Sequence, residues 1–160
     1  MTELPVRKPN RLAHFDYTRS GIYFITICVA DEKYVLTRLF AQDDIYRPYR
    51  SELTGLGDAV YTSINAIHSH YDAVTCEKYV IMPDHLHLLL RIEQAGGRMI
   101  SVPTVVGSLK RSVTCKLRIA IWQKGFYDHV IRNEHDYLEH YQYIENNPVK
   151  WLIKHSDDQS

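Results

Sequence analysis

Residues 74–92 read VTCEKYVIMPDHLHLLLRI, and this stretch decides the fold. Aliphatic, β-branched and aromatic side chains dominate 74–82 and 85–92, which is typical of strands. Pro83 stands between the two runs, and its nitrogen cannot donate a hydrogen bond to a sheet ladder. We therefore expect two strands here, either as a hairpin or as one long bent strand.

The second run alternates histidine with leucine. On a strand, side chains two residues apart share a face, so His85 and His87 would point the same way with their Cα atoms about 7 Å apart. The opposite face would enter the core with Leu86, Leu88 and Leu90. One metal ion could bridge the two imidazoles, although the spacing alone fits two ordinary histidines on a half-exposed strand better.

The rest of the chain supplies strands and helices in alternation. Residues 22–29 are β-branched and aromatic, as in a buried strand, and apolar residues recur at helical spacing in 53–70 and 102–117. We expect a short strand or packed loop at 126–131, then a helix over 134–146 that Asn133 caps and Pro148 ends. This order predicts an α+β fold, a ferredoxin-like antiparallel sheet with helices packed on one face.

Length and composition indicate one domain over residues 1–160, with residues 1–20 as a basic leader that includes Arg7 and Arg11. The chain carries 19 Lys+Arg and 19 Asp+Glu, so its net charge gives no case for nucleic acid or an anionic membrane. Three widely spaced cysteines and the lack of an apolar leader favour a reducing cytoplasm and no membrane.

One segment is nevertheless locally basic. No acidic residue lies between Glu93 and Asp128, while Lys and Arg recur there. Lys110, Arg111 and Arg118 fall outside the apolar stripe of the 102–117 helix, where they could contact phosphates. Trp122 follows this helix and could stack on unpaired bases. A solvated helix face with an ordinary core aromatic is the alternative.

The last helix has an apolar face and a polar stripe. Tyr137, Tyr141 and Ile144 fall on the face that would pack on the sheet. Beside them, a polar stripe follows helical spacing and comprises Asp136, His140, Tyr143 and Asn147. Alternatively, Tyr143 is a surface tyrosine and Asn147 a C-terminal cap before Pro148.

Together, these segments resemble the single-tyrosine HUH transposases, in particular the REP-associated tyrosine transposase branch. The resemblance covers most of the chain, through RLAHFDYTRSGIYFITICV, YVIMPDHLHLLL, VGSLKRSVTCKL and IWQKGFYDHVIRNEHDYLEHYQYIENNPVKW. It implies a metal-dependent endonuclease and strand transferase acting on single-stranded or hairpin DNA.

The resemblance also assigns roles. His85, His87 and Asn147 would hold Mg²⁺ or Mn²⁺, and Tyr143 would attack the phosphate to form a 5′-phosphotyrosine. A phenol with a pKa near 10 needs such help at neutral pH, and His140 is a candidate base. Whether the protein acts as a homodimer stays open. The competing interpretations are a non-catalytic ferredoxin-like module that binds nucleic acid and, with less support, a zinc hydrolase.

Overall fold

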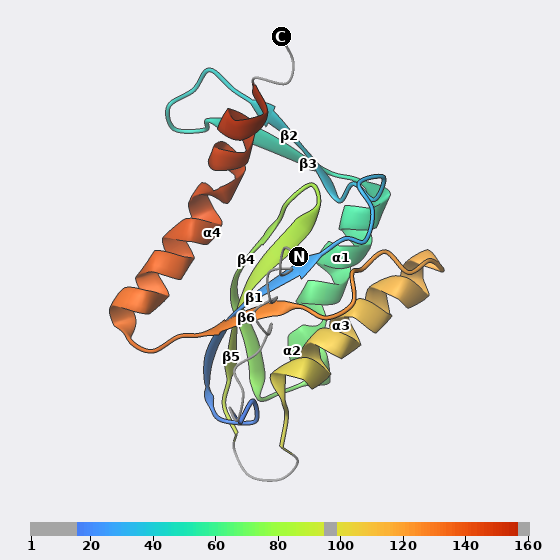
Figure 1. The fold of residues 1–160 in the computed structure, drawn as a ribbon, viewed down its shortest axis with the longest axis vertical. Coiled ribbons are helices and arrows are strands. Elements are labelled where there is room, and N and C mark those ends of the chain that lie inside the picture. The colour runs from blue at the N-terminus through green and yellow to red at the C-terminus, as the bar shows by residue number, and fades with distance from the viewer. Residues whose placement is uncertain (1–15, 95–98, 157–160) are drawn as a thin grey trace, which may run out of the picture.

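The main sheet has four strands in the order β4-β5-β1-β6, and every neighbouring pair is antiparallel. The computed structural model describes residues 16–94 and 99–156 (Figure 1). The four strands are β1 (Gly21–Cys28), β4 (Val74–Ile81), β5 (His85–Ile92) and β6 (Tyr127–Val130). The stretch 74–92 is thus a hairpin, closed by the Met82 amide donating to the His85 carbonyl at 2.8 Å.

Three helices cover one face of this sheet: α1 (Gly55–Asn65), α2 (Ile67–His70) and α3 (Val102–Leu117). Counting only the strands of the main sheet, the chain runs strand, helix, strand, strand, helix, strand, and the first strand lies between the last two. This is the ferredoxin-like arrangement, so the predicted α+β class and antiparallel sheet are confirmed. Both ends of α3 also agree with the helical spacing of its apolar residues.

Alternation along the strands puts the core between the sheet and these helices. On the face of β1 and β5 that points toward the helices, every second side chain is 0% exposed: Tyr23, Ile25, Ile27, Leu86, Leu88 and Leu90. They join Val105, Val106 and Leu109 of α3 in one cluster. Each fully buried aliphatic side chain contributes roughly 1.5–3 kcal/mol, so this parity holds the sheet in register. The side chains between them, which include His85 and His87, point to the opposite face of the sheet, away from this core.

The last helix, α4 (Glu134–His155), lies across that other face, opposite α1 and α3 (Figure 1). The predicted end at Pro148 is wrong, because the helix continues for another two turns. Proline inside a helix costs about 3 kcal/mol. Here Ile144, Asn147 and Pro148 are themselves buried, and this packing keeps the helix intact past the proline.

Two further differences concern residues 37–70. The predicted helix over 53–70 is divided at Ala66 into α1 and α2, and Thr54 caps the first of them by accepting from the Gly57 amide. A Cβ at Gly57 would stand 1.9 Å from the Leu36 carbonyl oxygen, so this helix approaches the preceding backbone too closely for any side chain. Before it, the chain forms a hairpin that the sequence did not indicate, β2 (Thr37–Ala41) with β3 (Tyr49–Leu53).

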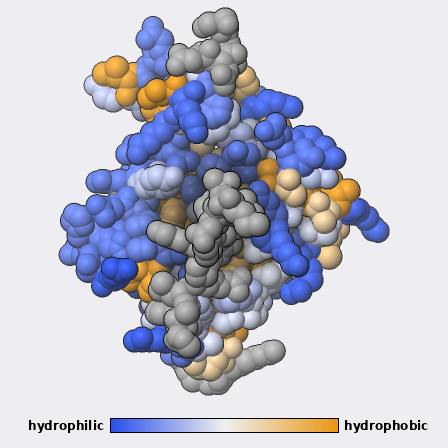
Figure 2. Space-filling model, in the orientation of Figure 1, coloured by the Kyte–Doolittle hydropathy of each residue, from blue (hydrophilic) through white to orange (hydrophobic). Residues whose placement is uncertain are grey.

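The β2–β3 hairpin projects beyond the main sheet toward the C-terminal end of α4 (Figure 1). Figure 2 shows a mainly hydrophilic face, with hydrophobic surface gathered at the upper left over the β2–β3 connection. Ile45 in that connection is 87% exposed. Within residues 16–94 and 99–156, none of the helices combines the length and apolar character needed to cross a bilayer.

Candidate functional site

The two histidines of β5 bring their ring nitrogens together on the α4 side of the sheet. The Nε2 atoms of His85 and His87 lie 3.1 Å apart, and the ring planes meet at 70°. His87 is almost wholly buried, whereas part of the His85 ring reaches solvent. Two nitrogen lone pairs at this distance require a proton or a cation between them, which makes the pair a candidate metal centre.

In each imidazole of the pair, the other ring nitrogen, Nδ1, lies at hydrogen-bond distance from a side-chain oxygen. His85 donates from Nδ1 to Asp84 Oδ1 at 2.6 Å, and this hydrogen bond lowers the pKa of the Asp84 carboxyl despite its partial burial. His87 Nδ1 lies 2.8 Å from Thr26 Oγ1, its cross-strand neighbour on β1. An oxygen partner at Nδ1 orients an imidazole and leaves Nε2 for a metal, as in known metal sites.

Burial also sets the charge of His87. Desolvation, followed by the nearby His85 ring, lowers the pKa of His87 from 6.5 to about 3. His87 is therefore neutral at physiological pH, and a neutral imidazole is the form that binds a metal.

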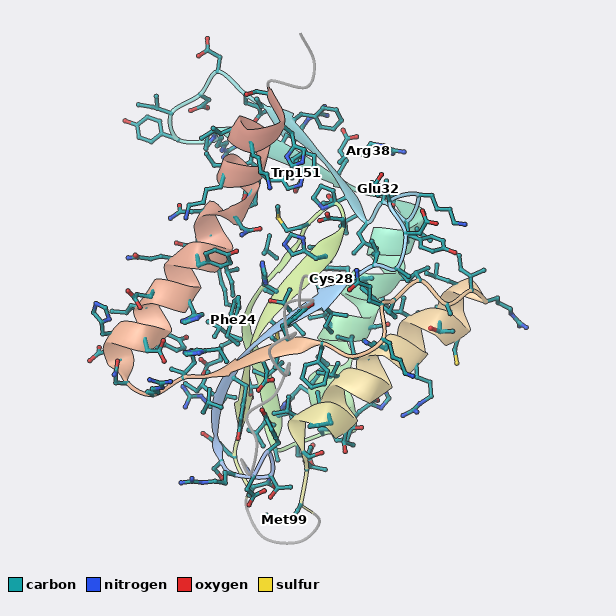
Figure 3. All side chains as sticks on the ribbon, viewed as in Figure 1. Phe24, Cys28, Glu32, Arg38, Met99 and Trp151 are labelled. Atoms are coloured by element: carbon teal, nitrogen blue, oxygen red, sulfur yellow. The ribbon has the colours of Figure 1, made fainter. Side chains whose placement is uncertain are left out.

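Tyr143 comes to the pair from α4. Its ring centre lies 5.3 Å from that of His87 and 5.9 Å from that of Phe24, in edge-on contacts. Tyr143 is 41% exposed, and Lys150 places its Nζ 5.5 Å from the ring centre. Phe24 lies on the side of the sheet that faces α4 and also stacks on His87 (Figure 3). This phenylalanine fixes the distance between helix and histidines.

Asn147 lies one turn after Tyr143 on α4 and is 8% exposed. Because the helix runs on to His155, Asn147 is not a C-terminal cap, and that alternative is wrong. The neighbouring Tyr141 faces β4, where Lys78 Nζ lies 3.4 Å from its hydroxyl and 4.5 Å from its ring centre. The tyrosines of α4 therefore have different surroundings, and among Tyr141 and Tyr143 the latter is the one in contact with His87.

His140 makes its contacts at the start of α4. Its Nδ1 lies 2.8 Å from the Asp136 backbone carbonyl oxygen, and its ring stacks on His129 and touches Phe24. A role as base for Tyr143 stays a prediction.

The predicted nucleic-acid residues lie apart from the histidine pair. Arg111 and Arg118 are exposed on α3 or at its C-terminal cap, and α3 covers the other face of the sheet. Lys110 has a structural partner, since its Nζ donates to the backbone carbonyls of residues 123 and 125. Trp122 is half-buried against the core. Arg7 and Arg11 fall outside the described residues.

Two hollows flank Asp84. One, of about 900 Å³, lies between the β2–β3 hairpin and the end of α4, and Glu32, Arg38 and Trp151 surround it (Figure 3). The other, of about 230 Å³, contains His85 and Cys28 in its lining. His85 is thus reached from solvent through the smaller hollow, and Asp84 lies between it and a cleft large enough for a nucleotide or more.

Sequence reasoning missed several neighbours of this site, chiefly Phe24, Thr26, Asp84 and Lys150. Parity along 22–29 could have placed Phe24 and Thr26 on the histidine face, because both alternate with core residues. Their pairing with β5, however, depends on strand register, which local sequence does not reveal. Lys150 lies beyond Pro148, where the helix was expected to have ended.

Proteins of two bacteria resemble this chain in sequence. An uncharacterised protein of Haemophilus influenzae is 32% identical over 91% of this chain and 89% of its own length. A second protein of that organism, provisionally named a REP-associated tyrosine transposase, is 29% identical over 84% of this chain and 74% of its own. The REP-associated tyrosine transposase of Escherichia coli is 35% identical over about half of each chain. No protein-family model matches.

A solved structure shares the fold. A REP-associated tyrosine transposase bound to a REP hairpin superposes with a TM-score of 0.66 at 22% identity, over 88% of this chain and 73% of the other. The sequence relatives and this structure agree with the resemblance seen in the histidine, tyrosine and NNP segments. The chain is thus related in sequence to proteins named REP-associated tyrosine transposases, and it shares the fold of one of them.

Proposed function

We propose that this protein is a metal-dependent nuclease and strand transferase that nicks single-stranded or hairpin DNA and rejoins it through Tyr143. One observation carries the proposal: Tyr143 contacts His87 at 5.3 Å between ring centres, and the Nε2 atoms of His87 and His85 converge to 3.1 Å. An accessible phenol beside two convergent imidazoles is suited to phosphoryl transfer with a protein nucleophile.

The donor set fits a divalent cation. His85 and His87 have oxygen partners at Nδ1, which supports coordination through both Nε2 atoms, and Asn147 is the proposed third ligand. Two imidazoles with one amide oxygen suit Mn²⁺ better than Mg²⁺, which prefers oxygen ligands, although Mg²⁺ can serve in the cell. When bound, the cation would neutralise charge on the scissile phosphate.

The remaining chemistry belongs to the side chains. The Tyr143 oxygen forms a bond to phosphorus and loses its proton, while the bond from phosphorus to the 3′ oxygen breaks and that oxygen takes up a proton. The products are a 5′-phosphotyrosine and a free 3′-OH. Lys150, with its ammonium 5.5 Å from the Tyr143 ring centre, favours the negative charge that develops on the phenol oxygen and the phosphate. A later 3′-OH can reverse the step without ATP, because the phosphotyrosine keeps the bond energy.

The cleft and the relatives support DNA as the partner. The hollow of about 900 Å³ beside Asp84 offers Trp151 for base stacking and Arg38 for phosphate contact, next to the histidine pair. The related transposase of known structure binds a REP hairpin. We therefore propose that a DNA strand enters along this cleft. We further propose that residues 1–160 act as one domain in the cytoplasm; the cysteines of the described chain are free, as suits a reducing compartment.

The test is covalent capture. Full-length protein is incubated with Mn²⁺ and a labelled hairpin oligonucleotide with single-stranded flanks, and the products are separated under denaturing conditions. We expect a protein–DNA adduct on the 5′ end of the cleaved strand. Tyr143→Phe should abolish both adduct and cleavage, and His87→Ala should abolish them by removing a metal ligand.

Tyr141→Phe is the matched control, because this tyrosine on the same helix faces Lys78 and should retain the adduct. Cleavage without an adduct would indicate hydrolysis by water, as in the zinc-hydrolase alternative. Binding to DNA with no cleavage in the wild type, and no effect of Tyr143→Phe, would favour the non-catalytic binding module.

A further inference from the structure

A second group of metal-binding side chains lies where β6 meets the start of α4. Among the residues that the structure describes, His129, Asp136 and His140 offer ligand atoms that all lie within 4.8 Å of one another. His129 comes from β6 and the other two from neighbouring turns of α4. All three side chains are partly buried, and Asp136 is 15% exposed.

The Asp136 carboxylate contacts both histidines of this group directly. His129 Nε2 lies 3.0 and 2.9 Å from the two carboxylate oxygens of Asp136, and His140 Nδ1 lies 3.2 Å from Oδ1. The Arg132 amide donates to Oδ2 at 2.9 Å, which holds the carboxylate in place from outside the group. Such an outer hydrogen bond is characteristic of carboxylates that bind metals.

We propose that His129, Asp136 and His140 form a second metal site, selective for Zn²⁺ and distinct from the His85–His87 pair. Two imidazoles and one carboxylate are a common zinc donor set, and a water molecule can complete a tetrahedron. The single negative charge of Asp136 balances half the charge of the ion. The two sites are separated by Phe24, whose ring contacts His140 on one side and His87 on the other.

The position of this site indicates what it does. A zinc ion there ties the N-terminal half of α4 to β6, and α4 carries Tyr143 three residues after His140. Because Phe24 contacts both His140 and Tyr143, fixing His140 also fixes the ring against which Tyr143 rests. The role of the ion is to position the helix, and the inference does not depend on the nuclease proposal.

The test measures metal binding directly. The full-length chain without a polyhistidine tag, in a His85→Ala background that disables the first site, is stripped of metal and titrated with Co²⁺ and then Zn²⁺. We expect visible absorption typical of tetrahedral Co²⁺, bleached by Zn²⁺, and a rise in Tm with Zn²⁺. His129→Ala and, separately, His140→Gln should each weaken Zn²⁺ binding at least about tenfold.

His135→Ala is the matched control, since this histidine is on the same helix, is 83% exposed and should leave Zn²⁺ affinity unchanged. Circular dichroism establishes that each variant is folded, and agreement between the His129 and His140 variants guards against a folding defect in either. Unaltered Zn²⁺ affinity in both variants, or complete loss of metal binding in His85→Ala alone, would overturn the proposal. The three side chains would then only connect β6 to α4 through hydrogen bonds.

Discussion

Acidification should destabilise this protein through His87 in a way that can be measured. Burial lowers the pKa of this ring from 6.5 to about 3, because the charged form would lose its water and would face His85. The unfolded chain therefore binds a proton at mildly acidic pH that the folded chain does not. The free energy of unfolding must fall as pH falls from about 6.5 toward about 3, since the lowered pKa belongs to the folded state.

The magnitude follows from the two pKa values. Between pH 7 and pH 5, most of the unfolded chains become protonated at this position while the folded ring stays neutral. The difference amounts to roughly 2 kcal/mol, because each unit of pKa difference corresponds to about 1.4 kcal/mol. His87 is only 4% exposed, so solvent screening removes little of this effect.

The assay is urea denaturation at pH 7 and pH 5, with a chelator present so that no metal contributes. We expect wild type to lose about 2 kcal/mol more stability on acidification than His87→Gln, because glutamine has no proton to gain. Comparing the pH dependence of the two proteins removes the cost of the substitution itself. As a control, the exposed His135→Gln should behave like wild type. Equal losses in wild type and His87→Gln would refute the reasoning.

Three other predictions concern close packing and charge. Gly57→Ala should lower the free energy of unfolding by at least about 2 kcal/mol, because its Cβ would overlap the Leu36 carbonyl. Gly107→Ala in α3 meets no atom within 4 Å and should raise it by about 0.5–1 kcal/mol. Denaturation curves that show changes of the same sign for both variants would contradict this. Lys110→Met should cost about 1 kcal/mol in the same assay, since two loop carbonyls lose their donor, and an unchanged midpoint would argue against those bonds. Arg111→Gln should reduce the log-log salt slope of hairpin-DNA binding by somewhat under one if α3 contacts phosphate, and an unaltered slope would place the DNA on the α4 side alone.

Local periodicity accounts for what could be predicted. The alternation in 85–90 is sufficient to put His85 and His87 on the face opposite the leucines, because side-chain direction on a strand depends only on parity. Helical spacing likewise puts Tyr143 and Asn147 on one stripe. Both are short-range properties of the chain, and the α+β class follows from their order.

Tertiary structure decided how these pieces meet. Strand register places Thr26 beside His87, and the packing of α4 on the uncovered face brings Tyr143 to the pair and carries the helix through Pro148. The group of His129, Asp136 and His140 likewise needs β6 and α4 in contact. Such contacts join residues far apart in sequence, and their energy depends on the burial of whole faces. A local pattern thus determined which way each side chain points, and long-range packing determined which side chain it meets.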